Sequence, residues 1–142
     1  MKILVATDGS KSALQAVKYA SKLVRQLSST SSSITLISVH DDTGLRHAKA
    51  FVGSDAVADY LRELSEKELK PAQKVLDAAG IKHDMEVRVG HVAQEIVQCA
   101  KAGKFDLIVL GAKGRSAIVD LLIGSVAQRV LATAEMPVLL TR

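Results

Sequence analysis

Short apolar runs alternate along the chain with longer segments in which apolar residues recur every three or four positions. A short run of aliphatic and β-branched residues is typical of a strand in a parallel sheet, where both faces are covered. Five runs fit: "KILVAT" at 2–7, "ITLISVH" at 34–40, "HDMEVRV" at 83–89, "FDLIVL" at 105–110 and "PVLLT" at 137–141. The third run alternates and the fifth begins with proline, and both features predict strands at the edges of the sheet.

The segments between these runs have the spacing of amphipathic helices. One helix is expected after Ser10, which can act as its N-cap, and others at residues 57–79, 92–102 and from Ser125 onward. Because an interior proline costs about 3 kcal/mol, Pro71 is expected to kink or divide the helix at 57–79. Residues 41–53 have no clear period and are expected to be irregular.

The order of these elements predicts an α/β fold in one domain, residues 1–142. Strands that alternate with helical crossovers form an open, five-stranded parallel sheet with helices on both faces. The runs at 2–7 and 105–110 are the most uniformly apolar, so they belong side by side in the middle of the sheet. Ligands of such sheets bind where the strand order reverses, beyond the carboxyl ends of the strands. The loops "TDGS" and "GAKG" follow these two strands and should converge on one crevice.

Composition and charge narrow the class of protein. The chain is 48% hydrophobic but only 3% aromatic, so its core must be aliphatic. The net charge is +4, yet no five like charges are consecutive and no aromatic residue lies in a basic cluster; this argues for a solvated basic surface and against nucleic acid. The single cysteine, Cys99, is interpreted as a packing residue and fits a reducing compartment. No segment approaches the ~20 apolar residues of a membrane span, so a cytoplasmic protein with no membrane partner is expected.

The glycine-rich stretch near the end of the chain predicts a phosphate site. Gly111 and Gly114 follow the strand at 105–110, and Gly124-Ser125 opens the last helix. Glycines let the backbone amides approach an anion, and a helix N-terminus adds unpaired amides and the positive end of its dipole. Residues 115–123 must fold back so that Gly124 lies beside Gly114, while Lys113 and Arg115 add positive charge at the rim.

Other interpretations of the same residues remain open. The glycines could simply turn the chain. Neither of the two other glycine-rich phosphate motifs, the P-loop and the G-x-G-x-x-G pattern, is present. Asp8 could cap the first helix or contact a sugar hydroxyl or an adenine amine. The segment "HDD", residues 40–42, is interpreted as an Asx turn or helix cap rather than as a contact to a metal carried by phosphates. No histidines have the spacing of a zinc site, so no protein metal site is expected.

Five stretches of the chain carry a family resemblance. They are "ILVATDGS", "VRVGHVAQEIVQCA", "DLIVLGAKGRS", "IGSVAQRVL" and "PVLL", and they span nearly the whole sequence. Together they resemble the universal stress protein family, and G-x2-G-x9-G-S resembles the branch that binds ATP. The resemblance implies an adenine nucleotide alpha hydrolase-like sheet of order 3-2-1-4-5. It also implies a homodimer formed by antiparallel pairing of the last strands, Pro137 to Thr141.

The resemblance also implies which residues contact the nucleotide. Ala6, Thr7 and Asp8 would contact the adenosine, and the backbone of Val39 the edge of the adenine. The ribose and phosphates would be held by Gly111, Ala112, Lys113, Gly114 and Arg115. Further phosphate contacts would come from Gly124, Ser125 and Val126.

The expected function is that of a dimeric, cytosolic stress-response regulator that binds ATP, AMP or ADP without efficient turnover. Mg²⁺ or Mn²⁺ would be held by the phosphates, and no catalytic residue is assigned, because the phosphate loop offers no carboxylate except Asp120. Nucleotide binding would order residues 111–124 and change a surface seen by an unknown regulatory protein partner. Two alternatives are a slow ATPase or phosphotransferase, self-modifying at Ser125 or Ser116, and a dimerising scaffold that binds no nucleotide.

Overall fold

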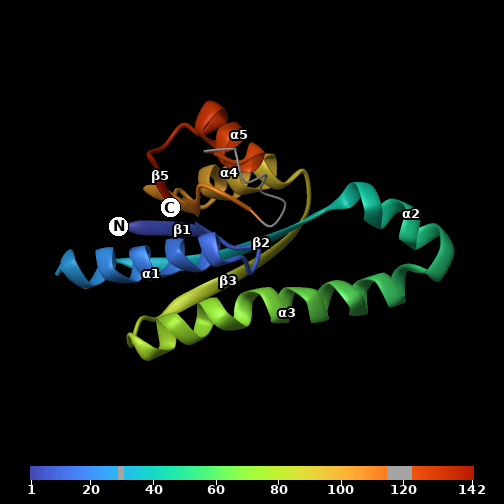
Figure 1. The fold of residues 1–142 in the computed structure, drawn as a ribbon, viewed down its shortest axis with the longest axis horizontal. Helices are drawn as coiled ribbons and strands as arrows, with labels where there is room; N and C mark the ends of the chain where they lie inside the picture. The colour runs from blue at the N-terminus through green and yellow to red at the C-terminus, as the bar shows by residue number, and fades with distance from the viewer. Residues whose placement is uncertain (29–30, 115–122) are drawn as a thin grey trace.

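Strands and helices alternate along the chain, as Figure 1 shows for the computed structural model, which describes residues 1–28, 31–114 and 123–142. The strands are β1 (Lys2–Ala6), β2 (Ser33–Asp41), β3 (His83–Gly90), β4 (Leu107–Gly111) and β5 (Val138–Thr141). The helices are α1 (Lys11–Gln26), α2 (Asp42–Val52), α3 (Ser54–Ala78), α4 (Val92–Ala102) and α5 (Ser125–Thr133). Among the described residues, no helix is both long enough and apolar enough to cross a bilayer.

The strands form one parallel sheet in the order β3-β2-β1-β4-β5, which confirms the predicted fold class. The strand β1 is central: its Val5 pairs with Leu36 of β2 on one side and with Val109 of β4 on the other. The chain therefore moves outward from β1 to β3, crosses back over the sheet, and continues from β4 to β5. The reversal falls between β1 and β4, where the apolar pattern places it.

Two layers of helices cover the sheet, one on each face (Figure 1). On one face, α1 and α3 bury side chains such as Val17 and Leu76 against Ile3, Val5 and Leu36. On the other face, α4 and α5 bury Ile96, Ala100 and Val130 against Leu4 and Ile108. The core is aliphatic on both faces, as the composition requires.

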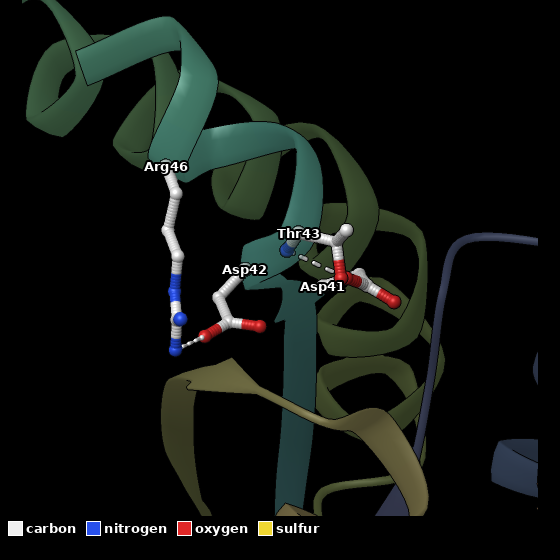
Figure 2. Close-up of polar contacts among 4 residues, drawn as sticks. All are labelled: Asp41, Asp42, Thr43 and Arg46. Atoms are coloured by element: carbon white, nitrogen blue, oxygen red, sulfur yellow. Dashed lines mark hydrogen bonds and ion pairs between the residues drawn. The ribbon is translucent and has the colours of Figure 1, made fainter. Parts of the chain in front are cut away.

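The segment between β2 and α3 is helical, and the prediction that residues 41–53 are irregular is wrong. Asp41 is the N-cap of α2, and its carboxylate accepts a hydrogen bond of 2.8 Å from the backbone N–H of Thr43. The next residue, Asp42, pairs at 2.8 Å with Arg46 one turn further along the helix, as Figure 2 shows. All the described residues of α2 are at least partly exposed. The helix lies beside α3 beyond the end of the sheet (Figure 1), so capping and local pairing replace a buried apolar stripe.

Pro71 lies inside α3 and does not divide it, so of the two expected outcomes, a kink or a division, the structure excludes the division. The helix runs without interruption from Ser54 to Ala78. Leu69, Ala72 and Leu76, on both sides of the proline in sequence, are almost fully buried in the core. Tertiary packing of this face therefore outweighs the hydrogen bond that proline cannot donate.

The edge strand β3 is half exposed, as its alternation predicts, but its apolar face is the exposed one. Met85, Val87 and Val89 are 50%, 48% and 44% exposed. On the alternate positions Arg88 lies 3.0 Å from Glu86 and 3.5 Å from Glu95 of α4. An ion-pair network therefore links the charged positions of this strand to α4.

Candidate functional site

A pocket of about 340 Å³ lies at the carboxyl ends of β1 and β4, where the order of the strands reverses. Its walls come from the loop after β1, the loop after β4, the start of α5 and one face of α4. The volume is in the range of small-molecule sites in proteins. The pocket therefore occupies the position in an open parallel sheet where ligands bind.

The loop from β1 to α1 is held by side chains that bond to their own backbone. Asp8 accepts a hydrogen bond of 2.9 Å from the N–H of Ser10, and Thr7 accepts one of 3.3 Å from Gly9, whose φ is 79°. The hydroxyl of Ser10 accepts the N–H of Ala13 at 3.1 Å, which confirms Ser10 as the cap of α1. Asp8 therefore organises the turn before α1 instead of capping it, and its Oδ2 would lie 3.3 Å from a Cβ atom added at Gly114.

The loop after β4 lies directly on the first turn of α1. A Cβ atom at Gly111 would lie 2.7 Å from the carbonyl carbon of Ser12 and 2.8 Å from its oxygen. Two residues further, the N–H of Lys113 donates to the hydroxyl of Ser12 at 3.3 Å. Only glycine lets β4 end this close to α1, so Gly111 and Ser12 together set the position of the loop. The sequence analysis did not select Ser12, although its place in the first turn after "TDGS" is a usable signal.

The start of α5 returns to the loop after β4, as the glycine spacing predicts. The N–H of Gly124 donates to the carbonyl of Ala112 at 2.6 Å. A Cβ atom at Gly124 would lie only 3.6 Å from the backbone nitrogen of Gly114. Gly124 is the N-cap of α5 and, among the described residues, no side chain caps this helix start. Two glycine backbones and the first turn of a helix thus meet at one wall of the pocket.

An apolar part of the lining, which we call the apolar floor, was missed by sequence reasoning. It is formed by Ala13, Ile37, Val92, Ile96, Leu110 and Ala127. The alternation of β2 and the four-residue spacing of Val92 and Ile96 were available signals. They became usable only once the strand order placed β2 and α4 beside the same crevice.

The structure brings together the site residues selected from the sequence, as far as it describes them. Eleven of the twelve line this one pocket: Ala6, Thr7, Asp8, Val39, Gly111, Ala112, Lys113, Gly114, Gly124, Ser125 and Val126. The twelfth, Arg115, lies outside the described residues, as do Ser116 and Asp120. The segment whose ordering was expected on binding, 111–124, includes the same undescribed residues.

Asp41, the last residue of β2, is the N-cap of α2, which confirms the predicted helix cap. Hydrogen bonds from the side chain and the backbone of Thr43 hold the pKa of Asp41 below its ordinary value of 3.8, with a smaller contribution from His91. Asp106 lies at the opposite end of the sheet, where it accepts the N–H of Lys2 at 2.7 Å. In the parts of the chain that are described, no group of three or more His, Cys, Asp or Glu side chains could hold a metal ion.

These features define an open α/β protein with a pocket at its topological switch point. The whole chain, residues 1–142, matches the universal stress protein family. It is 33% identical over 141 residues to Universal stress protein MJ0531 of Methanocaldococcus jannaschii, a match that covers 99% of this chain and 81% of that protein. The chain therefore belongs to the universal stress protein family.

Solved structures of similar sequence have the same fold. MJ0577 of Methanocaldococcus jannaschii superposes with a TM-score of 0.80 at 27% identity, over 99% of this chain and 94% of that one. A universal stress protein solved in complex with cAMP superposes with a TM-score of 0.74 at 26% identity, over 100% of this chain and 97% of the other. The second of these proteins thus holds an adenine nucleotide on this fold.

Proposed function

We propose that this universal stress protein binds an adenine nucleotide, with ATP as the main ligand, in the pocket at the carboxyl ends of β1 and β4. The observation that carries the proposal is the convergence of Gly111–Gly114 with the uncapped start of α5. Backbone amides gathered in this way bind phosphate oxygens, and the helix dipole favours their negative charge. The cAMP complex of a structural neighbour supports an adenine nucleotide as the ligand.

The two sides of the pocket suit the two ends of a nucleotide. The apolar floor, which includes Ile37, Val92 and Ile96, offers a dry surface to a flat base. We assign Ala6, Thr7 and Asp8 to the adenosine, and the backbone of Val39 to the edge of the adenine. The glycine loop from Gly111 through Arg115, with Gly124, Ser125 and Val126, is assigned to the ribose and phosphates. Mg²⁺ or Mn²⁺ would accompany the nucleotide on its phosphates.

The proposed role is regulatory binding without efficient turnover. Hydrolysis of ATP needs a base or a positioned water near the terminal phosphate. Asp8 is the one carboxylate among the described residues that line the pocket, and it already accepts a hydrogen bond from Ser10. The protein would act in the cytoplasm by presenting different surfaces to a regulatory protein in its free and nucleotide-bound states.

The proposed assembly is a homodimer through the free edge of β5. The carbonyls of Pro137 and Thr141 accept hydrogen bonds of 3.0 and 2.7 Å from Ile108 and Ala112, so these alternate positions face β4. The N–H groups of Val138 and Leu140 then point to the open edge. Antiparallel pairing of two such edges would extend the sheet across both copies. Leu140→Pro removes one edge donor and is expected to shift sedimentation from dimer to monomer while far-UV circular dichroism is retained; a dimer that persists would contradict this assembly.

Titration calorimetry with ATP tests the nucleotide proposal, with Gly114→Asp as the decisive variant. A Cβ atom at Gly114 would lie 3.3 Å from Oδ2 of Asp8, so the variant sets a second carboxylate against Asp8 where the phosphates are proposed to lie. We expect binding to be lost while the unfolding midpoint stays close to that of the wild type. The matched control is Gly44→Asp, because a Cβ atom at Gly44 has no described atom within 4 Å.

Each other outcome assigns a different function. If the wild type fails to bind at millimolar ATP, the dimerising scaffold without nucleotide replaces this proposal. If Gly114→Asp binds with unchanged affinity, the phosphate site is misplaced. Several turnovers of ATP per minute, lost in Asp120→Asn, would replace regulatory binding by a slow ATPase or phosphotransferase.

A further inference from the structure

The strand β3 forms one free edge of the sheet, and β5 forms the other (Figure 1). In the described part of the chain, no strand pairs with the outer side of β3. The strand has eight residues and spans about 26 Å at ~3.3 Å per residue, and the side chains of Met85, Val87 and Val89 are about half exposed. A long edge strand with exposed apolar side chains is a ready template for pairing with another chain.

The features that usually prevent such pairing are weak in β3. Edge strands are protected by prolines, by bulges, or by lysines and other charged side chains. The strand contains neither proline nor lysine, and its eight residues pair with β2 at consecutive positions without a bulge. Its arginine, Arg88, is paired with Glu86 and with Glu95 of α4, so these charges are largely neutralised. The edge is therefore open to a partner with a complementary pattern.

The backbone groups of alternate residues in β3 point to this open edge. Ser33 and Ile37 of β2 bond to the segment of β1, with hydrogen bonds of 3.0 and 2.9 Å, so the odd positions of β2 face β1 and the even ones face β3. Leu36, an even position, is opposite Met85. Because only one residue of each opposed pair bonds across a parallel ladder, the N–H and C=O groups of Met85 point outward. The same alternation applies to residues 87 and 89.

We propose that β3 pairs in antiparallel orientation with β3 of a second copy, around a twofold axis at Val87. In this register Met85 lies opposite Val89, Glu86 lies opposite Arg88, and the symmetry makes each pair occur twice. The apolar pairs share one face of the extended sheet and the charged pairs share the other, since side chains alternate along a strand. Opposed apolar residues and opposed opposite charges both stabilise antiparallel pairs. A second copy therefore matches this edge on both faces.

The other registers of the same two strands are less favourable. An axis at Glu86 or at Arg88 places two like charges directly opposite each other, which is destabilising. An axis at Met85 places Asp84 opposite Glu86, and an axis at Val89 leaves at least half of the strand unpaired. An axis between two residues sets outward-pointing amides against inward-pointing ones and breaks the ladder. Charge and backbone direction therefore both select the central register.

The self-complementary charge pattern of β3 favours a second copy over a peptide of unrelated sequence. The contact leaves the edge of β5 and the nucleotide pocket free, since β3 is at the opposite edge of the sheet and does not line the pocket. Two different edges that each pair around a twofold axis link the copies into open chains. One pair of strands is at the small end of specific interfaces, which bury about 1,200–2,000 Å², so we expect this contact at higher protein concentrations than the β5 dimer.

Disulfide cross-linking tests the register. In Val87→Cys the two introduced thiols meet at the axis, where the Cα atoms of an antiparallel pair are about 5.5 Å apart, within the range of a disulfide. In the matched control Val89→Cys, the two copies of residue 89 are about 13 Å apart, which is too far. Under mild oxidation, Val87→Cys should form a covalent dimer about tenfold faster or more than Val89→Cys. The buried Cys99 is common to both variants.

Sedimentation velocity from micromolar to near-millimolar protein tests the association itself. The mean mass of the wild type should rise with concentration, and so should that of Leu140→Pro, which lacks an edge donor of β5. Val87→Lys places two ammonium groups on the axis and should abolish the rise. Val87→Thr, which keeps a β-branched side chain without charge, should retain it. The comparison of these two variants holds whether or not β5 forms a dimer, and neither requires nucleotide.

A charge variant tests the polar face of the same contact. Glu86→Lys places an ammonium group opposite the guanidinium of Arg88 in the second copy and should weaken the association about fivefold or more. The control Glu66→Lys makes the same change of charge at an exposed position of α3 and should associate like the wild type. Equal weakening in both variants would mean that net charge, and not this contact, controls the association.

Three further results would overturn the proposal. One is cross-linking of Val87→Cys no faster than that of Val89→Cys, which would exclude the register. Another is a wild-type mass that does not rise with concentration, which would leave this edge to a different protein partner. The third is the same rise in Val87→Lys as in Val87→Thr, which would assign the association to another surface.

Discussion

The close approach of β4 to α1 predicts that Gly111→Ala is destabilising. The added Cβ atom would lie 2.7 and 2.8 Å from the carbonyl carbon and oxygen of Ser12, whereas ordinary contacts of this kind begin at 3.4 Å. These are backbone atoms, so no rotation of a side chain relieves the overlap. The end of β4 and the first turn of α1 must therefore move apart by about 0.6 Å, which is the difference between the 2.8 Å contact and an ordinary van der Waals contact of 3.4 Å.

The size of the effect follows from what that separation disturbs. The first turns of α1 pack Ala13, Ala16 and Val17 in the core, and these small side chains allow the helix to lie close to the sheet. Overpacking of a well-packed site typically costs 1–3 kcal/mol. We therefore expect the free energy of unfolding to fall by about 1–3 kcal/mol in Gly111→Ala.

Urea unfolding followed by circular dichroism measures this change, with Gly44→Ala as the matched control. Gly44 lies inside α2, and no described atom is within 4 Å of its Cβ position, so this variant should be neutral or more stable by up to about 1 kcal/mol. The double variant Ser12→Ala/Gly111→Ala should remain destabilised, because it removes only the hydroxyl. A single variant within about 0.5 kcal/mol of the wild type, or full rescue by Ser12→Ala, would refute the reasoning.

Three further predictions concern other parts of the fold. Ser38→Ala should lower stability by about 1–3 kcal/mol in urea unfolding, because Ser38 donates a 2.8 Å hydrogen bond to Glu68, which is only 6% exposed. Asp41→Ala should cost about 0.5–2 kcal/mol and speed amide exchange in α2. Since the folded pKa of Asp41 is lowered, its cap contributes above pH 3.8 and is lost as the pH falls through the folded pKa. The protection factors of the α2 amides, which are corrected for the slower intrinsic exchange in acid, should therefore fall only in acid. Burial raises the pKa of the Cys99 thiol, so labelling by a thiol reagent at pH 8 should be slow in the native protein and fast in urea.

The sheet could be predicted because apolar runs report burial on both faces. The runs at 2–7 and 105–110 became β1 and β4, and the alternation of residues 83–89 correctly placed β3 at an edge. Alternation does not say which face is turned to solvent, however. In β3 the apolar face is the exposed one, and Arg88 on the other face pairs with two carboxylates, one of them on α4.

The wrong prediction for α2 and the undivided helix at Pro71 have a common physical origin. Apolar residues recur every three or four positions in a helix that packs on a core. The helix α2 makes little such contact because it lies beyond the end of the sheet (Figure 1). Its own signals are local: the cap at Asp41 and the pair of Asp42 with Arg46. Conversely, the free-energy cost of a proline inside a helix is offset at Pro71 by the burial of α3 against the sheet. For each helix, the free energies of local capping, pairing and proline insertion must therefore be compared with the free energy of burial in the core.

The glycine loops could be placed from the sequence because the carboxyl ends of parallel strands share one edge of the sheet. The strand order is enough to predict that one pocket is lined by Gly111, Gly114 and Gly124. The floor of that pocket required more, because Val92 and Ile96 come from a helix whose orientation the linear pattern does not give. Ser12 was missed for a similar reason: its partner, Lys113, is 101 residues away in the chain.

The four basic residues of α1, Lys11, Lys18, Lys22 and Arg25, show how counting along the chain can conceal a charged surface. These four cations are separated by six, three and two residues, so no run of like charges exists. A helix repeats every 3.6 residues, and it therefore converts this interrupted series into one continuous row. The neighbouring charges of both signs in the sequence belong to other elements and do not neutralise the row. The net charge of +4 is therefore concentrated on α1 and is not spread evenly over the surface.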